Sequence, residues 1–352
     1  MGIVIREAVL PADRNILLDT LLRNRQHGDQ TMRQARFEWS LSRNPYGQPR
    51  AWLAIDESSG KVVGAVSAFP RRVLINGAPV LAWNGADTSI DKDFRTLGVA
   101  IKLRRAVKEC VDRGEMRFLY SHPVENMRVV LEKVGHVVIG RLARHSVILR
   151  FDRFLNKWTG KNLFSSMLAH VANPVLLAWR GNWLRSNGLA VRLQAQTRFD
   201  DEYDELFDST DWGFPVIAVR DAQFLSWRFL QNPTHKEFCI FRLEEEKQLR
   251  GYAVVDFQGD GARILDFLTP AHGEKAGVLL AGIIRWLRAH GYCSLSVRAS
   301  DHNPILPILR SFGPGFCDTV NSSIAVHAHP EGPDRIVLNE QNWFMTQADR
   351  DV

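Results

Sequence analysis

The stretch DFRTLGVAIKLRRAVKECVDRG, residues 93–114, joins a short polar turn to a long helical pattern. Apolar residues recur in it every three or four positions, which predicts a helix over residues 98–112 with one buried face. The turn from Arg95 to Ala100 places Gly98 and other small residues at the start of that helix. Backbone N–H groups at a helix start have no partner within the helix, so the pattern favours an anion here, and a phosphate group in particular.

The size and composition of the chain fit two soluble domains. Its 352 residues exceed what one hydrophobic core usually holds, and 45% of them are hydrophobic and 24% charged. The start, MGIVIREAVLPADRN, carries charges and no apolar segment, so no secretory signal is expected. The cysteines form no CxxC pair; they are Cys110, Cys239, Cys293 and Cys317. We therefore expect a cytoplasmic protein with neither a disulfide framework nor a metal site.

Positive charge is concentrated in one segment of the chain, whose net charge is +6. Between residues 150 and 192 there is a single acid, Asp152, against seven basic side chains, so this segment accounts for the whole excess. The basic residues are Arg150, Arg153, Lys157, Lys161, Arg180, Arg185 and Arg192. Because the rest of the chain is balanced, a nucleic-acid partner is disfavoured.

The chain repeats several landmarks in the same order. WSLSRNP at residues 39–45 matches WRFLQNP at residues 227–233, since Trp is followed by Asn and Pro at the same spacing in both. Later, Asn126 in SHPVENMRVV and Asn303 in ASDHNPILP each follow a strand pattern and precede a short helical one. Landmarks that recur in a fixed order indicate an internal duplication.

Each half predicts a mixed layer of strands and helices. In the first half, strand patterns precede the long helix and one follows it, at residues 51–56, 62–69, 72–76, 80–90 and 117–122. Strands interrupted by a helix favour an α/β (α+β) arrangement. The predicted limits are 1–150 for the first domain, 151–200 for a basic helical connector, 201–330 for the second domain and 331–352 for a C-terminal tail.

The connector contains an apolar run, residues 163–179, that is too short and too interrupted by Asn173 and Pro174 to cross a bilayer. Its tryptophans and flanking basic residues suit peripheral contact with the inner membrane face through residues 155–192. Packing against one or both domains is the commoner fate of an amphipathic helix, and we favour it.

The first half resembles the GNAT N-acetyltransferase superfamily. A strand pattern, VLAWNGADTSI, leads into Arg-x-x-Gly-x-Ala and a helix, which is similar to the acetyl-coenzyme A signature of that family. The whole chain looks like the tandem GNAT-like proteins associated with bacterial polysaccharide biosynthesis. The resemblance implies two tandem domains, each a mixed, mainly antiparallel sheet flanked by helices, and acetyl-CoA or another acyl-CoA as cofactor. It assigns to the cofactor Arg95, Thr96, Leu97, Gly98, Val99 and Ala100 at the pyrophosphate and Thr88, Ser89, Ile90 and Asn126 along the pantetheine arm.

Two departures from the family pattern change what the resemblance implies. The second half lacks the Arg-x-x-Gly-x-Gly/Ala turn, and Glu274 in the equivalent place would repel a pyrophosphate. One cofactor site is therefore expected, in the first half. Many family members also use a tyrosine to protonate the departing thiolate, and Leu131 and Leu309 stand at that position here.

Three side chains near the cofactor strand are candidates for catalysis. Asp87 could act as a base, or be a solvated or hydrogen-bonded carboxylate at a strand end. His122 could shuttle protons near neutral pH, or be a structural histidine. Tyr120 is a further candidate, although core packing with one hydrogen-bond partner is the simpler expectation. Asn126 also has two interpretations, a helix cap or a contact with the pantetheine.

Together these features predict acyl transfer from acyl-CoA to a primary amine of a small molecule, by direct attack in a ternary complex. An amino sugar of a surface polysaccharide is one candidate acceptor. The alternative class is a non-catalytic GNAT-like protein that binds a ligand or acts as a scaffold, which the missing tyrosine and the altered second turn favour. Transfer from an aminoacyl-tRNA is disfavoured by the balanced charge outside the connector.

Overall fold

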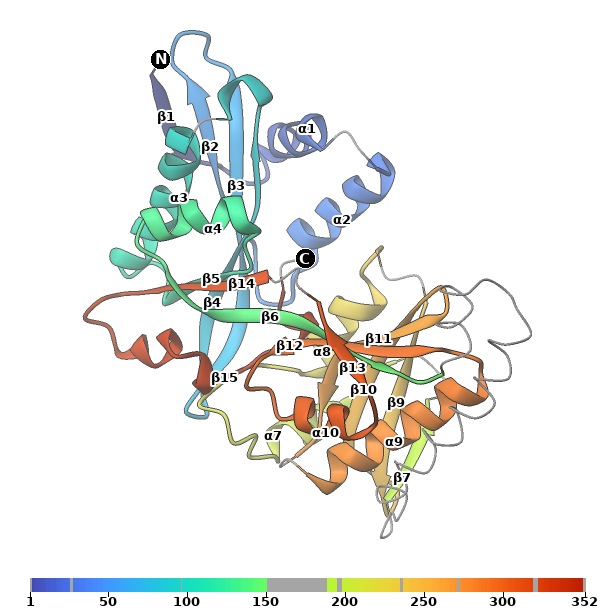
Figure 1. Cartoon of the computed structure of the whole chain (residues 1–352). Helices are drawn as coiled ribbons and strands as arrows, with labels where there is room; N and C mark the ends of the chain where they lie inside the picture. The colour runs from blue at the N-terminus through green and yellow to red at the C-terminus, as the bar shows by residue number, and fades with distance from the viewer. Residues whose placement is uncertain are drawn as a thin grey trace.

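The computed structural model describes residues 2–25, 28–95, 97–150, 189–194, 198–234, 237–270, 273–318 and 322–350. These residues form two lobes joined by one continuous, mostly antiparallel sheet (Figure 1). The first half of the chain supplies β1 (Ile3–Glu7), α1 (Arg14–Asn24), α2 (Gln30–Ser42), β2 (Arg50–Asp56), β3 (Val62–Ile75), β4 (Ala78–Ile90), η1 (Lys92–Phe94), α3 (Leu97–Asp112), β5 (Phe118–Ser121), α4 (Glu125–Lys133) and β6 (Val137–Ile148).

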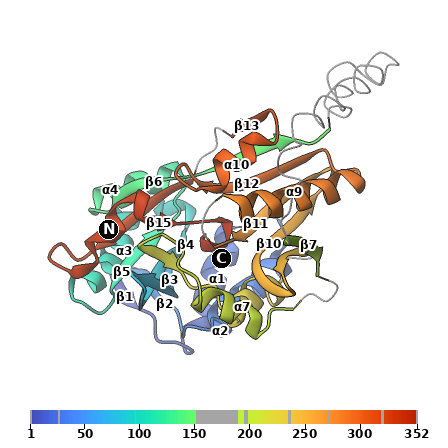
Figure 2. The same cartoon turned by 90° about the horizontal axis from the view of Figure 1, so that it is seen from below.

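The second half begins with a short edge strand and ends in a series of tight turns. It supplies β7 (Leu189–Leu193), α7 (Asp201–Asp208), β8 (Val216–Ala218), α8 (Ala222–Leu225), η3 (Ser226–Leu230), β9 (Phe238–Glu245), β10 (Gln248–Gln258), β11 (Gly261–Leu268), α9 (Glu274–Ala289), β12 (Ser294–Ser300), α10 (Ile305–Ser311), β13 (Gly315–Cys317), β14 (Ser322–Ala328), η4 (Pro333–Leu338), η5 (Glu340–Asn342), β15 (Trp343–Phe344) and η6 (Gln347–Asp349). In Figure 2, α1, α2 and α7 lie on one side of the sheet and α4, α9 and α10 on the other.

The long helix predicted over residues 98–112 is α3, and its counterpart in the second half, α9, has the same length of 16 residues. Each helix buries one apolar face on its own sheet. On α3 this face contains Val99, Leu103 and Val107, which pack with Trp52 and Val63 of the strands. Burial of apolar surface contributes about 25 cal/mol per Å², so such a face stabilises a helix more than its intrinsic propensity does.

One strand replaces two predicted ones. The patterns at residues 62–69 and 72–76 form the single strand β3, which runs through Pro70. Proline has no backbone N–H, so it normally lies at a strand edge or end. Here β2 pairs with β3 only as far as Ala68, and β8 pairs with it from Val73 onward. Pro70 lies in the gap between these two neighbours, and the prediction of two separate strands was therefore wrong.

The described part of the predicted helical connector contains a strand, β7, so the helical assignment was wrong there. This strand pairs with β9 at the edge of the C-terminal lobe. Leu189 is buried, and Val191 packs against α9 beside Gly282, because alternate residues of a strand share one face. Residues 151–188, which include the apolar run and most of the predicted membrane contact, lie outside the described residues.

The two lobes exchange strands. β6 starts in the N-terminal lobe, and its second half pairs with β12 on one side and β13 on the other, both in the C-terminal lobe. In return, β14 leaves the C-terminal lobe and pairs with β5 and with the first half of β6. β14 lies within the predicted second domain, residues 201–330, but it completes the sheet of the first. Each lobe therefore depends on a strand from the other half of the chain.

The repeated tryptophans contact each other across the two halves. Trp39 of α2 and Trp227 of η3 stack with their ring centroids 4.5 Å apart. Trp39 Nε1 also donates a hydrogen bond to the carbonyl oxygen of Trp227 at 3.0 Å, and both rings are buried. The repeated motif thus joins the lobes.

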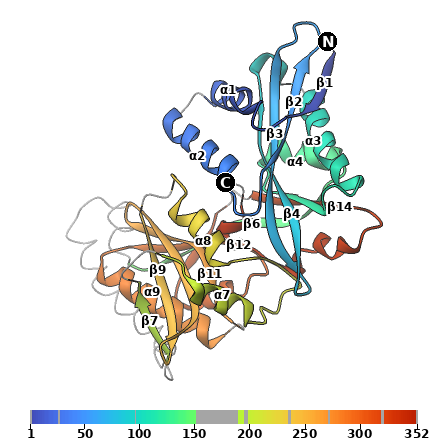
Figure 3. The same cartoon turned by 180° about the vertical axis from the view of Figure 1, so that it is seen from behind.

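A buried ionic network lies at the junction of the lobes and includes the C-terminal segment. Arg220 is fully buried, and its guanidinium contacts Asp266 at 3.2 Å and Asp349 at 2.6 Å. The hydroxyl groups of Thr346 and Tyr252 each donate to Asp266 at 2.7 Å. Burial by itself lowers the pKa of Arg220, but the two carboxylates outweigh burial and raise it above its ordinary value. The predicted tail is therefore part of the core over residues 343–349 (Figure 3).

We expect Arg220→Met to lower the free energy of unfolding by about 3–5 kcal/mol, because it leaves Asp266 and Asp349 buried without a cation. Urea denaturation measures this change. Arg128→Gln is the matched control: Arg128 pairs with Glu125 and Glu132 on the surface of α4, where an ion pair contributes at most about 1 kcal/mol. A loss for Arg220→Met no larger than that of the control would show that the network does not hold the lobes together.

Candidate functional site

β4 and β5 pair at one end and separate at the other. These parallel strands are bonded only where Trp83–Asn84 meets Leu119–Tyr120. Beyond that point, residues 85–90 of β4 have β3 on one side and, among the described residues, no strand on the other. We call the two diverging ends the β4/β5 fork. Its open backbone edge includes residues 88–90, where the sequence resemblance predicts the pantetheine arm.

A β-bulge shapes β4 inside the fork. Asp87 and Thr88 together oppose Val66 of β3, and Asp87 has a φ of +50°. Aspartate tolerates this left-handed backbone better than most residues do. The Asp87 carboxylate lies against the end of α1 and against α2, where Arg25 and Arg36 each contact it at 3.2 Å. Only 8% of the side chain is exposed, so Asp87 is a hydrogen-bonded and largely buried carboxylate, not a solvated one.

The start of α3 lies at the far end of the fork. Gly98 is exposed in the first turn, whereas Val99 and Ala100 turn their side chains into the core, so the backbone amides there are the groups that could meet an anion. Arg95 Nε donates to the carbonyl oxygen of Ile90 at 2.9 Å, which ties the turn to β4 and occupies that oxygen. Thr96 and the side chain of Leu97 lie outside the described residues.

Buried hydroxyl groups without hydrogen bonds line the fork. Within the described part of the chain, those of Thr88, Ser89 and Ser121 are buried and reach no partner. A buried polar group in this state costs about 1–3 kcal/mol, so three of them on the two strands of the fork indicate a place for a polar ligand or water. At Gly85 a Cβ would lie 2.7 Å from Ser121 Oγ, so glycine leaves room there for Arg104 of α3. An open strand edge, unsatisfied hydroxyls, a buried cation and a helix start fit an acyl-CoA.

Tyr120 and His122 are buried at the end of β5. The ring of Tyr120 packs edge-on against His122 and at a tilt against Trp343, with ring centroids 5.8 Å apart in both pairs. Burial raises the pKa of Tyr120 to about 12. Burial, with a smaller contribution from the charge of Arg350, lowers the pKa of His122 to about 3. His122 is therefore neutral near pH 7, which favours the structural interpretation of this histidine over proton shuttling.

Asn126 does not cap the short helix that follows β5. α4 begins at Glu125, with Val124 at the N-cap and no side-chain cap, and Asn126 is exposed inside the first turn. The capping interpretation was therefore wrong in the first half. In the second half, Asn303 Oδ1 does accept a hydrogen bond from the backbone N–H of Ile305 at 3.0 Å.

The equivalent fork of the second half is filled by the chain itself. β11 and β12 pair over their first four residues and then separate, and Thr346 forms a β-bridge with Ala299 at the end of β12. The Thr346 hydroxyl reaches Asp266 of β11, so the C-terminal segment spans the space between the strands. The cavity left beside it, lined by Phe344 and Asn303 among others, measures about 10 Å³, which is at most enough for one water. This supports the expectation of one cofactor site, in the first half.

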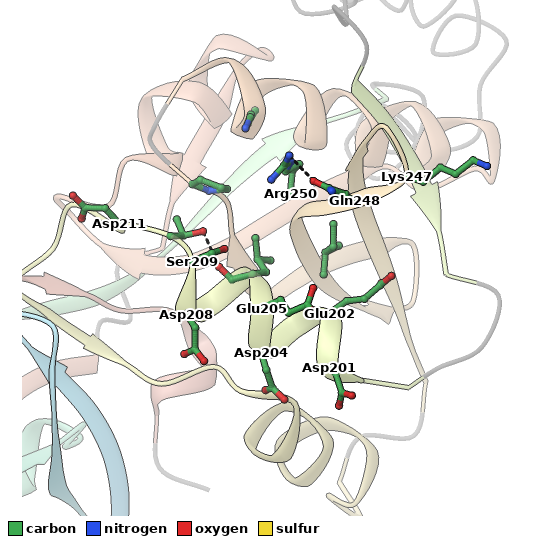
Figure 4. A pocket seen from close by; sticks show the side chains of 15 residues that line it. Asp201, Glu202, Asp204, Glu205, Asp208, Ser209, Asp211, Lys247, Gln248 and Arg250 are labelled. Carbon is green, nitrogen blue, oxygen red and sulfur yellow. Dashed lines mark hydrogen bonds between the residues drawn. The ribbon is translucent and has the colours of Figure 1, made fainter.

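A larger cavity of about 1000 Å³ lies elsewhere, against α7 (Figure 4). Acidic side chains of α7 form one wall, and Figure 4 shows Asp201, Asp204 and Asp208 directed away from the opposite wall, where Arg250 donates to Gln248. None of the site residues predicted from the sequence lines this cavity.

Sequence reasoning missed several contributors to the fork, among them Ser121 and Arg104. Arg25 and Arg36 are ordinary surface-type residues of a helical region, and only knowledge of how the end of α1 and α2 lie at Asp87 would have selected them. Arg350 lies in the segment NWFMTQADRD, whose apolar start, with Trp343, Phe344 and Met345 all buried, was the available signal that it enters the core.

The fold can be compared with known proteins. No protein-family model matches the sequence, and no curated protein sequence does. Among solved structures, a probable N-acyltransferase from Enterococcus faecalis V583 superposes with a TM-score of 0.67 at 10% identity, covering 93% of this chain and 73% of that one. A GCN5-related N-acetyltransferase from Anabaena variabilis ATCC 29413 gives 0.62 at 13% identity, covering 92% and 73%. A tandem GNAT protein from the clavulanic acid biosynthesis pathway, without acetyl-CoA, gives 0.53 at 14% identity, covering 93% and 98%.

Identities this low establish the fold alone. The chain has a GNAT-like fold in tandem, with a large, mostly antiparallel sheet flanked by helices, as the sequence resemblance predicted. Among the described residues, no helix is both long enough and apolar enough to cross a membrane.

The low pKa of His122 makes the stability of the protein depend on pH. Between pH 6.5 and about 3 the unfolded chain binds a proton at this residue and the folded chain does not, so acid favours unfolding. As pH falls below 6.5, His122 should cost up to about 1.4 kcal/mol of stability per pH unit. Urea denaturation of wild type and His122→Phe between pH 7.5 and 4.5 measures the difference. His302→Gln, at an exposed position, is the control, and parallel curves for wild type and His122→Phe would contradict the assignment.

Proposed function

We propose that the protein is an acyl-CoA-dependent N-acyltransferase, most simply an N-acetyltransferase, that acts on a primary amine of a small molecule. The observation that carries this proposal is the β4/β5 fork: an open strand edge with three unsatisfied buried hydroxyls leads to the start of α3. An amino sugar of a surface polysaccharide is an acceptor that the sequence resemblance favours.

The residues of the fork have distinct parts in this proposal. Backbone groups of Thr88 and Ser89 bind the pantetheine arm, and the exposed first turn of α3 at Gly98 binds the pyrophosphate. Arg95 holds that turn against β4 through its bond to Ile90. A bound acyl-CoA would supply the thioester whose acyl group is transferred.

The acceptor amine would lie beside Asp87, on the side of the sheet that α2 covers. Asp87, fixed by Arg25 and Arg36, accepts an N–H of the amine and orients its lone pair toward the acyl carbon. Neutral His122 donates or accepts a hydrogen bond, and Tyr120 positions its ring. Leu131 is fully buried at the position of the usual acid. A thiol has a pKa of about 8.5, so the thiolate can leave near neutral pH without one.

Titration calorimetry with acetyl-CoA is the direct test. We expect one site per chain with micromolar affinity, weakened about tenfold or more by Gly98→Glu, because the added carboxylate lies in the turn that would hold the pyrophosphate. Lys275→Glu is the matched control, since it places the same carboxylate at the second residue of α9, where the fork is already filled. Its affinity should equal that of the wild type.

Two results would overturn the proposal. The absence of binding by a folded wild-type chain would favour the alternative, a non-catalytic GNAT-like protein. Equal losses in Gly98→Glu and Lys275→Glu would mean that the cofactor does not use the start of α3.

A further inference from the structure

The acceptor side of the β4/β5 fork carries an excess of positive charge. Asp87 receives two guanidinium groups, Arg25 Nη1 at 3.2 Å and Arg36 Nη1 at 3.2 Å. Two cations on one carboxylate leave a net charge of +1. A guanidinium has five N–H donors, and the contacts to Asp87 use a single nitrogen of each arginine, so donors remain on both.

The C-terminal segment places a further arginine near the end of β5. Arg350 follows Asp349, and both lie within electrostatic range of His122 at the end of β5. Asp349 does not balance that charge, because its carboxylate is bound by Arg220 at 2.6 Å and lies 3.7 Å from Arg71. Arg350 Nε is buried and makes no hydrogen bond within the described residues.

We propose that Arg25 and Arg36 form an anion-binding subsite that takes a carboxylate or phosphate group of the acceptor. That the anion belongs to an acceptor rests on the proposed function, but the subsite itself is defined by the two arginines and by their positions around Asp87. The substrate class is then an amine that also carries an anionic group, such as a phosphorylated amino sugar or an α-amino acid.

Electrostatics gives such a subsite two effects on the reaction. Arginine pairs well with carboxylate and phosphate oxygens, and charge-assisted hydrogen bonds are about twice as strong as neutral ones. The same positive charge disfavours the ammonium form of the acceptor and lowers the pKa of its amine, so more of the attacking neutral amine is present. A polycationic acceptor without an anionic group would gain neither benefit and would be repelled.

Direct binding tests the subsite without requiring any transfer. We would measure, by calorimetry in the presence of coenzyme A, the affinities of two matched pairs of acetylated products. The first pair is N-acetylglucosamine 6-phosphate and N-acetylglucosamine, and the second is an N-acetyl amino acid and its amide. We expect the anionic member of at least one pair to bind about tenfold tighter than the neutral member, with a preference that falls as salt is raised. The pair that shows the preference identifies phosphate or carboxylate as the source of the anion.

Variants on α2 separate the subsite from general charge effects. Arg36→Gln should reduce the preference for the anionic member to about threefold or less, and Arg36→Lys should retain part of that preference. Arg43→Gln is the matched control, since Arg43 is an exposed arginine at the C-terminal end of the same helix and should leave the preference intact. Tight binding of an anion that is insensitive to Arg36→Gln would overturn the proposal, as would equal affinities, or no binding, in both pairs.

Transfer assays then distinguish failure of the subsite from failure of the proposed function. With acetyl-CoA and the unacetylated amines, kcat/KM should favour the anionic acceptor by a similar factor. A clear anion preference in binding with no transfer to any amine would leave the subsite standing and count against the acyltransferase. Transfer to neutral and anionic amines at equal kcat/KM would support the acyltransferase and contradict the proposal of an anion-binding subsite.

Discussion

The exchange of β6 and β14 between the lobes is the constraint on which the rest of the structure depends. In each lobe the strand that follows the fork is paired not by a local neighbour but by a strand from the other half of the chain. β14 pairs with β5 residue by residue from Phe118 to Ser121, so the strand that carries Tyr120 is held by residues more than two hundred positions away in sequence. A site at the β4/β5 fork can form only when both halves have folded, because β5 has no other antiparallel partner among the described strands.

The second half supplies support for the site, not a second site. Its own fork has the same divergence of strands, but Thr346 and Phe344 fill it from the C-terminal segment. Arg220 binds both Asp266 of β11 and Asp349 of that segment, so this buried network fixes the segment in place. Arg350 follows Asp349 and lies within electrostatic range of His122, at the end of β5. The segment that closes one cofactor cleft thereby positions charge at the other. The two halves of a duplicated fold can differ in this way, one with an open fork and the other supporting it, because neither half completes its sheet alone.

Local sequence patterns predict much of this arrangement. They do not predict the contacts between residues that are far apart in the sequence. The periodicity of residues 98–112 predicted α3, and the repeated Trp-x4-Asn-Pro motif marked the two residues that stack between the halves. The sequence predicted separate strands before and after Pro70, but β3 continues through that residue because β2 pairs with it only as far as Ala68 and β8 only from Val73. The ion pairs of Asp87 with Arg25 and Arg36 have no signal in sequence, since they exist only because the fold brings the end of α1 and α2 to Asp87.

The charge around Asp87 bears on how a fork without the usual tyrosine could still support transfer. A neutral amine attacks a thioester readily when the two are held together, so what the site must supply is deprotonation of the acceptor and a fixed geometry. Two arginines on one aspartate disfavour a bound ammonium, which does part of the deprotonation by electrostatics before any base acts. They also hold the Asp87 carboxylate in one position at the bulge, where the backbone of Asp87 has a strained φ of +50°. The positive surroundings of Asp87 thus act on the acceptor amine alone. The thiolate, whose thiol has a pKa of about 8.5, can leave near neutral pH without a proton donor, so a leucine at position 131 is compatible with the proposed activity.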